Sequence, residues 1–244
     1  MKQIIIAVNA IMFSCATLLA DQGKTKTQAP FPTSHTTRQI EGWTVRVDDR
    51  LLSGDGAAIG EQALKLLQAR LFLITTVVSE EPLAKLRTVT IELDLTYGGL
   101  TNMQYHPDAG WLKENGYSET LAKCVHIPAT KDFLSHFEIH RGPWVVLHEL
   151  SHAYHDQVLG FEDARIIAAY KKFRDSGKYK SVLTIDGPMR EHYALTNEKE
   201  FFAEMSECYL GTNDFYPFVA GELKRDEPDI YTLLQSIWGP LPKK

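Results

Sequence analysis

Two histidines and a glutamate stand at a spacing that is typical of a metal site. The segment from residue 143 to residue 156 reads PWVVLHELSHAYHD and contains His148, Glu149 and His152 in the pattern HExxH. Pro143 suits a first helical turn, and the apolar residues around the histidines suit burial. Residues four apart on a helix lie on one face, about 6 Å apart along the axis, so both imidazoles can bind one zinc ion. Glu149 points roughly 100° away, beside the metal, where a base for the attacking water belongs.

A second segment supplies a third candidate ligand. Residues 193–204 read YALTNEKEFFAE, in which Thr196 or Asn197 can cap a new helix, and Glu200 and Glu204 then share one helix face. Two carboxylates beside aromatic residues that pack into a core are costly to desolvate unless a positive charge lies near them. A zinc ion bound by two histidines and one glutamate would supply that charge. Helix geometry does not choose between Glu200 and Glu204, and Glu200 also suits a capping box with Asn197.

His155 competes as a ligand because it falls on the same side of the first helix as His148 and His152. A rise of about 1.5 Å per residue places it about 10 Å from His148 along the axis. Zinc binds nitrogens at about 2.1 Å, so these two rings cannot both reach one ion. His155 is therefore not expected to be a ligand. The sequence also lacks the extended metzincin motif with its third histidine.

The HELSH motif, followed some fifty residues later by Y-x6-EFFAE, resembles the catalytic domain of anthrax lethal factor and its relatives, which are gluzincin-type zinc metallopeptidases. The similarity covers roughly residues 144–216. It implies that His148, His152 and Glu200 bind one zinc ion per chain and that Glu149 is the general base. It also implies a zincin-like fold, in which a small mixed sheet accompanies the helix that carries HExxH.

The same resemblance implies roles for two further residues. Tyr193 corresponds to a tyrosine that stabilises the transition state, and Glu204 corresponds to an acid that lies next to the ligands without binding the metal. Ser151 departs from the glycine that is frequent before the second histidine in these relatives, but serine is also small. The sequence shows no toxin delivery domain, so a role as a toxin inside host cells is not expected.

We therefore expect a zinc metallopeptidase that hydrolyses peptide bonds of a peptide or protein substrate. One alternative is a zinc amide hydrolase that acts on cell-wall peptide or another non-protein substrate, because it would need the same residues. Another alternative is a catalytically silent zinc-binding module. Such a module would need His148, His152 and Glu200 but neither Glu149 nor Tyr193, so the presence of both disfavours it.

The rest of the chain predicts an α+β fold. Alternating apolar residues indicate a strand that contains Trp43, Val45 and Val47, with further strands at 88–93 and 124–127 and a loop region near 97–117. Helical periods cover residues 57–78, 143–157, 163–175, 197–210 and 227–238. We expect one domain over residues 40–244, with an α+β part at 40–140 and a mainly helical part, including the zinc site, at 141–244.

The N-terminal residues are typical of an exported protein. Residues 1–20 combine Lys2 with an uncharged apolar stretch and predict a signal peptide, which implies a secreted or periplasmic protein without a membrane span in the mature chain. Cys15 after Ser14 is an alternative site for lipid attachment. Residues 21–39 are rich in Thr, Gln, Pro and Ser and predict a flexible tether.

Composition excludes several classes of protein. The 244 residues include 26 basic and 31 acidic side chains, for a net charge of -5, so the chain offers no broad basic surface for nucleic acid. Three cysteines are too few for a disulfide scaffold. In an oxidising compartment Cys124 and Cys208 either pair or remain free thiols, and the sequence does not choose between these states. It also indicates no substrate specificity and no oligomeric state.

Overall fold

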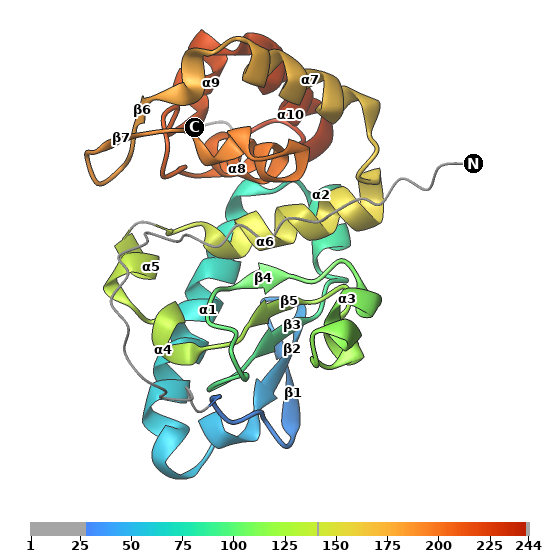
Figure 1. The fold of residues 1–244 in the computed structure, drawn as a ribbon, viewed down its shortest axis with the longest axis vertical. Coiled ribbons are helices and arrows are strands. Elements are labelled where there is room, and N and C mark those ends of the chain that lie inside the picture. The colour runs from blue at the N-terminus through green and yellow to red at the C-terminus, as the bar shows by residue number, and fades with distance from the viewer. Residues whose placement is uncertain (1–27, 141, 243–244) are drawn as a thin grey trace, which may run out of the picture.

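A five-stranded mixed sheet forms one end of the molecule (Figure 1). The computed structural model describes residues 28–140 and 142–242. In spatial order the strands are β1 (His35–Ile40), β2 (Trp43–Asp48), β3 (Ile91–Leu93), β5 (Val125–Ile127) and β4 (Gln104–Tyr105). The three central strands are parallel, and β1 and β4 are antiparallel edge strands. The predicted α+β class and the three predicted strands are confirmed.

Helices cover the sheet and make up most of the C-terminal half. They are α1 (Ala57–Val77), α2 (Glu80–Leu86), α3 (Ala109–Glu114), α4 (Thr130–Phe133), α5 (His136–His140), α6 (Val145–Tyr154), α7 (Ala164–Asp175), α8 (Glu198–Leu210), α9 (Ala220–Asp226) and α10 (Pro228–Trp238). A short hairpin, β6 (Val182–Leu183) and β7 (Met189–Arg190), follows α7. The five predicted helices are confirmed, although the one predicted at 143–157 continues beyond Tyr154 as a π-turn (His155–Leu159).

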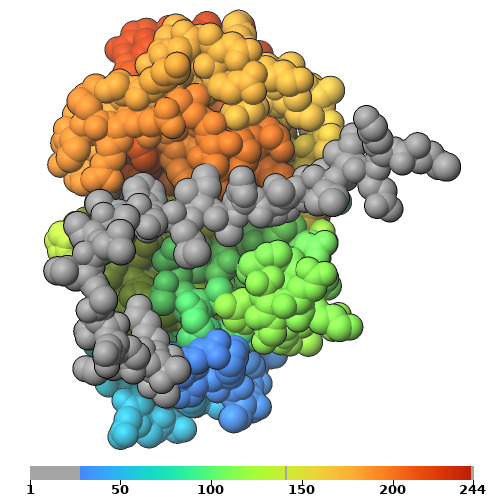
Figure 2. All heavy atoms as spheres, viewed as in Figure 1, coloured from blue at the N-terminus to red at the C-terminus, as the bar shows by residue number. Residues whose placement is uncertain are grey.

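Helix α6 lies between the sheet and the C-terminal helices. It packs against β4 on one side and against α8 on the other (Figure 1). The space-filling view shows the C-terminal helices, coloured orange to red, toward one end of the molecule and the blue and green sheet region toward the other (Figure 2). The side chains of α6 therefore lie between the sheet and the C-terminal helices.

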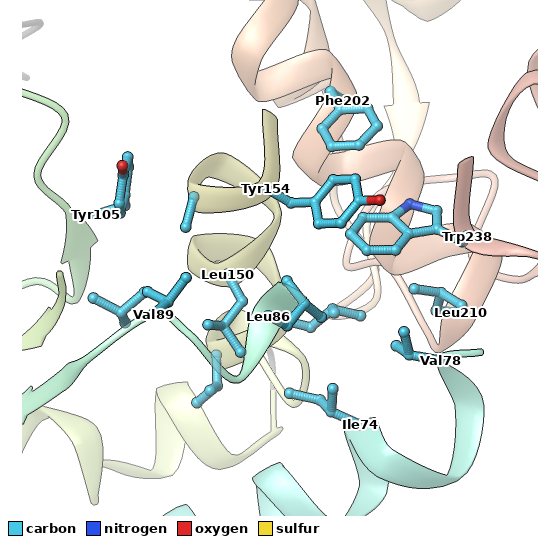
Figure 3. Close-up of a cluster of buried hydrophobic side chains, with 14 of the residues drawn as sticks. Ile74, Val78, Leu86, Val89, Tyr105, Leu150, Tyr154, Phe202, Leu210 and Trp238 are labelled. Atoms are coloured by element: carbon cyan, nitrogen blue, oxygen red, sulfur yellow. The ribbon is translucent and has the colours of Figure 1, made fainter. Parts of the chain in front are cut away.

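Apolar packing on both sides fixes α6. The alternating residues of β2 are fully buried and join one hydrophobic cluster with the buried faces of α1 and α6, including Leu150. On the other side of α6, the Tyr154 ring lies 4.6 Å from that of Trp238 on α10, which stacks on Phe202 of α8 (Figure 3). The Trp238 indole N–H donates to Ser206 Oγ at 2.9 Å, so its polar edge is also satisfied.

The prediction of a flexible tether through residue 39 is wrong for residues 28–39. β1 pairs with β2 along its whole length, and Ala29 forms a bridge to Gly98. The Phe31 ring packs edge-on against Tyr97 at 4.9 Å. An edge strand is held by backbone hydrogen bonds and does not need apolar side chains, so its composition resembles that of a tether. The predicted signal peptide, Cys15 and residues 21–27 lie outside the described residues.

Both described cysteines are free thiols. Cys124 and Cys208 are buried in different parts of the fold, so the pairing that the sequence left open does not form. Burial raises the pKa of both thiols, which keeps them protonated at neutral pH. Among the described residues, no helix is long and apolar enough to cross a membrane.

The Leu150→Ala substitution tests the packing of α6. Leu150 is fully buried, so its truncation leaves a cavity and is expected to lower the free energy of unfolding by about 2–5 kcal/mol, measured by urea denaturation. Leu73→Ala is the matched control, because Leu73 on α1 is 40% exposed and should change stability much less. Equal losses in the two variants would contradict this account of the core.

Candidate metal centre

The three predicted ligands meet at the contact between α6 and α8. His148 and His152 lie one turn apart on α6, and Glu200 lies in the first turn of α8, where Asn197 caps the helix. Glu200 Oε2 lies 3.2 Å from His148 Nε2 and 3.3 Å from His152 Nε2. One donor atom from each residue falls within 4.8 Å of the others. Two helices that are about fifty residues apart in sequence therefore bring together the set that the motifs predicted.

The arrangement of these donors suits a zinc ion. Ligand atoms about 2.1 Å from a tetrahedral zinc lie about 3.4 Å apart, which agrees with the two distances between Glu200 and the imidazoles. Burial raises the pKa of Glu200, but hydrogen bonds from His148 and His152 more than offset this, so its pKa falls below the ordinary value. Glu200 is therefore held as an anion that can bind a cation.

Glu149 lies beside these ligands and is fixed by the sheet. Its Oε2 accepts a hydrogen bond of 2.7 Å from the backbone N–H of Tyr105, on the edge strand β4. Burial raises the pKa of Glu149 above its ordinary value. A carboxylate with a raised pKa is a stronger base, so this environment suits a residue that takes a proton during the reaction.

Tyr193 lies at the mouth of the site. It begins a short 3₁₀ turn before α8, its side chain is 47% exposed, and its ring centroid lies 6.5 Å from that of His148. Burial and the nearby Glu200 raise the pKa of Tyr193 to about 12. The phenol therefore stays protonated at neutral pH and can donate a hydrogen bond to a substrate oxygen.

Glu207 is a site residue that the sequence analysis missed. His148 Nδ1 lies 2.6 Å from Glu207 Oε1 and 3.6 Å from Glu204 Oε1, so Glu207 accepts the hydrogen bond. Glu204 lies near the ligands, as the resemblance implied, but it does not orient the imidazole. Glu207 lies two turns after Glu200, on the same helix face, and this spacing was the available signal. In a neutral imidazole whose Nδ1–H donates to Glu207, Nε2 carries the lone pair that can bind a metal.

His155 does not reach the ligands. Its ring is fully buried and packs against Phe161 and Phe202, at centroid distances of 5.2 and 5.0 Å. Burial lowers the pKa of His155 to about 4, so the ring is neutral at physiological pH. The expectation from axial rise, that His155 is not a ligand beside His148, agrees with this position.

The described residues contain three groups of His, Asp and Glu that could hold a metal ion. One group is the predicted set, and another combines His148 with Glu204 and Glu207 behind it. The third, His35, Glu92 and Asp94, lies at the sheet. There Arg46 lies 2.5 Å from Glu92, and two histidines contact Asp94 at 2.7 and 2.9 Å, so both carboxylates already have protein partners. The predicted set and the group behind it both line a large cavity, whereas the third group does not.

This cavity has a volume of about 800 Å³ and is open to solvent. Residues 99–105, at the edge of the sheet, form one wall, and side chains of α5, α6 and α8 form the others. His148, Glu149, His152, Tyr193 and Glu200 all line it. A substrate in this cavity could therefore contact the metal ligands, the candidate base and the tyrosine together.

Comparisons with protein families, with curated proteins and with solved structures give no match to this chain. The similarity to lethal factor therefore rests on the two motifs and their spacing.

Glu207→Gln and Glu204→Gln test which acid orients His148. An amide is a weaker acceptor than a carboxylate, so Glu207→Gln is expected to weaken zinc binding by about 10- to 100-fold, measured by competition with a chelator of known affinity. Glu204→Gln should weaken it less, because the Glu204 carboxylate lies farther from Nδ1. The reverse order would assign the orienting role to Glu204.

Proposed function

We propose that this protein is a zinc-dependent metallopeptidase of the gluzincin type with a zincin-like fold. The observation that carries the proposal is the convergence of His148, His152 and Glu200 in a cavity of about 800 Å³, with Glu149 beside them. An HExxH helix and a glutamate from a later helix are typical of this class of zinc hydrolase.

Zinc is the metal that best suits the donors. Two imidazole nitrogens and one carboxylate oxygen form the three-ligand set of many catalytic zinc sites, which leave one position for water or substrate. When bound, zinc acts as a Lewis acid and lowers the pKa of water to about 7. Glu207 supports this assignment, because metal-binding histidines usually donate their other N–H to a carboxylate or carbonyl.

Glu149, Tyr105 and Tyr193 then have separate roles in amide hydrolysis. Glu149 takes a proton from the attacking water, and the Tyr105 N–H holds this carboxylate in place. The Tyr193 hydroxyl donates a hydrogen bond to the oxygen that gains negative charge as the carbonyl is attacked. Glu149 then passes its proton to the departing amine.

A sheet edge in the wall of the cavity supports a peptide as the substrate. Its wall at residues 99–105 includes β4, and β4 is paired with β5 on one side only. An extended chain can add its backbone hydrogen bonds to such an edge. The proposal also includes export from the cytoplasm, for which the support is the sequence of residues 1–20.

Metal analysis tests the ligand set. We expect about one zinc ion per chain in protein that begins at Asp21, and Glu200→Ala should lose most of it because two histidines alone bind zinc weakly. Elemental analysis after dialysis measures this. Glu198→Ala, in the same helix turn but outside the set, should retain the metal. Full retention in Glu200→Ala would exclude Glu200 as the third ligand.

Kinetics on unstructured protein substrates test the catalytic roles. Glu149→Gln should retain zinc but lose nearly all activity, because an amide cannot take the proton of water. Tyr193→Phe should lower kcat by about 10²- to 10³-fold with a smaller effect on KM, as removal of one oxyanion donor does. Hydrolysis of cell-wall fragments alone would instead favour an amide hydrolase with a non-protein substrate.

A further inference from the structure

In the described part of the chain, Lys199 is the one lysine or arginine that lines the cavity. The acidic residues that line the same cavity are Glu138, Glu149, Glu200, Glu204, Glu207 and Asp214. Lys199 Nζ lies 4.2 Å from the centroid of the Phe161 ring, which also lines the cavity. Among the residues that the structure describes, no carboxylate lies within ion-pair distance of this ammonium. The aromatic contact fixes the side chain and leaves its charge available to a ligand.

The position of Lys199 places this charge at one end of the site. Phe161 follows the π-turn that continues α6, so the lysine lies beyond the C-terminal end of this helix. Glu138 lies at the other end, where its Oε2 approaches Gly142, three residues before α6 begins. Helix and π-turn together extend roughly 20 Å, and the metal ligands lie between the two ends. An extended peptide of about six residues spans this length.

We propose that Lys199 is a specificity-determining residue that binds a carboxylate of the substrate. This inference rests on the proposed function and names the substrate class: peptides that carry a carboxylate, on an acidic side chain or at the C-terminus, on the Phe161 side of the bond that is cleaved. Because the Phe161 ring restrains the lysine before the substrate binds, less side-chain entropy is lost when the ion pair forms. A substrate lysine at that position would meet a like charge and bind weakly.

A set of fluorogenic peptides tests the proposal on the full zinc-loaded protein. The peptides share one sequence and carry Glu, Gln or Lys at each position in turn, with either a free or an amidated C-terminus. We expect kcat/KM to be about fivefold higher with Glu than with Gln at one position, or with the free than with the amidated terminus, as for a partly exposed ion pair. A preference for Glu at one position assigns the carboxylate to an acidic side chain, and a preference for the free terminus assigns it to the C-terminus.

Substitutions of Lys199 assign the preference. Lys199→Gln should remove it, and Lys199→Glu should reverse it in favour of Lys. Lys172→Gln is the control, because Lys172 lies on α7, outside the cavity lining, and pairs with Asp229. Equal kcat/KM for the Glu, Gln and Lys peptides and for both termini in the wild type, or a preference that persists in Lys199→Gln, would overturn the proposal.

Binding separates this inference from the proposed function. Zinc-loaded Glu149→Gln should bind the same labelled peptides without cleaving them, and fluorescence anisotropy measures their affinity. If the wild type cleaves no peptide, the proposed function fails, but the binding measurements still test whether Lys199 binds a carboxylate of the peptide. Tighter binding of carboxylate peptides that is lost in Glu149→Gln/Lys199→Gln supports the role of Lys199. Equal binding of all peptides by Glu149→Gln sinks it.

Discussion

The contact between α6 and α8 buries several carboxylates around two imidazoles, and the rest of the fold must offset the free-energy cost of burying these charges. Glu200, Glu204 and Glu207 present their acids from one face of α8 toward His148. Desolvation of these groups is costly unless positive charge lies among them. The apolar packing on both sides of α6, which belongs to one hydrophobic cluster, holds the two helices together despite this cost. A cation at this contact would bind groups that are already assembled, so little rearrangement would oppose it.

The sheet contributes to the same site through its edge. Tyr105 donates its backbone N–H to Glu149 and its hydroxyl to Asp156, so one residue of β4 contacts both α6 and the π-turn that continues it. Lys123 also pairs with Asp156 at 2.5 Å. The position of the candidate base therefore depends on strand pairing as well as on helix packing. A strand of two residues thus helps to position the Glu149 carboxylate.

Sequence predicted the features that depend on local patterns and missed those that depend on tertiary pairing. The helices around HELSH and EFFAE have strong periodicity, and their ligands follow from spacing along one helix face. β1 has few apolar residues and is held by its hydrogen bonds to β2, so no local pattern marked it. Glu207 shares a face with Glu200, but only the packing of α8 on α6 shows that it reaches His148 Nδ1.

The π-turn at His155–Leu159 lies between the helix that carries His148 and His152 and the segment that carries Phe161. A π-turn holds about one residue more than an α-helical turn, so the length of the chain can change there without a change in the winding of α6 before it. Phe161 and its contact with Lys199 follow the turn, whereas His148 and His152 precede it on α6. Insertions and deletions at this point therefore give evolution a route to a different cavity wall around Phe161 that leaves the candidate ligands in place.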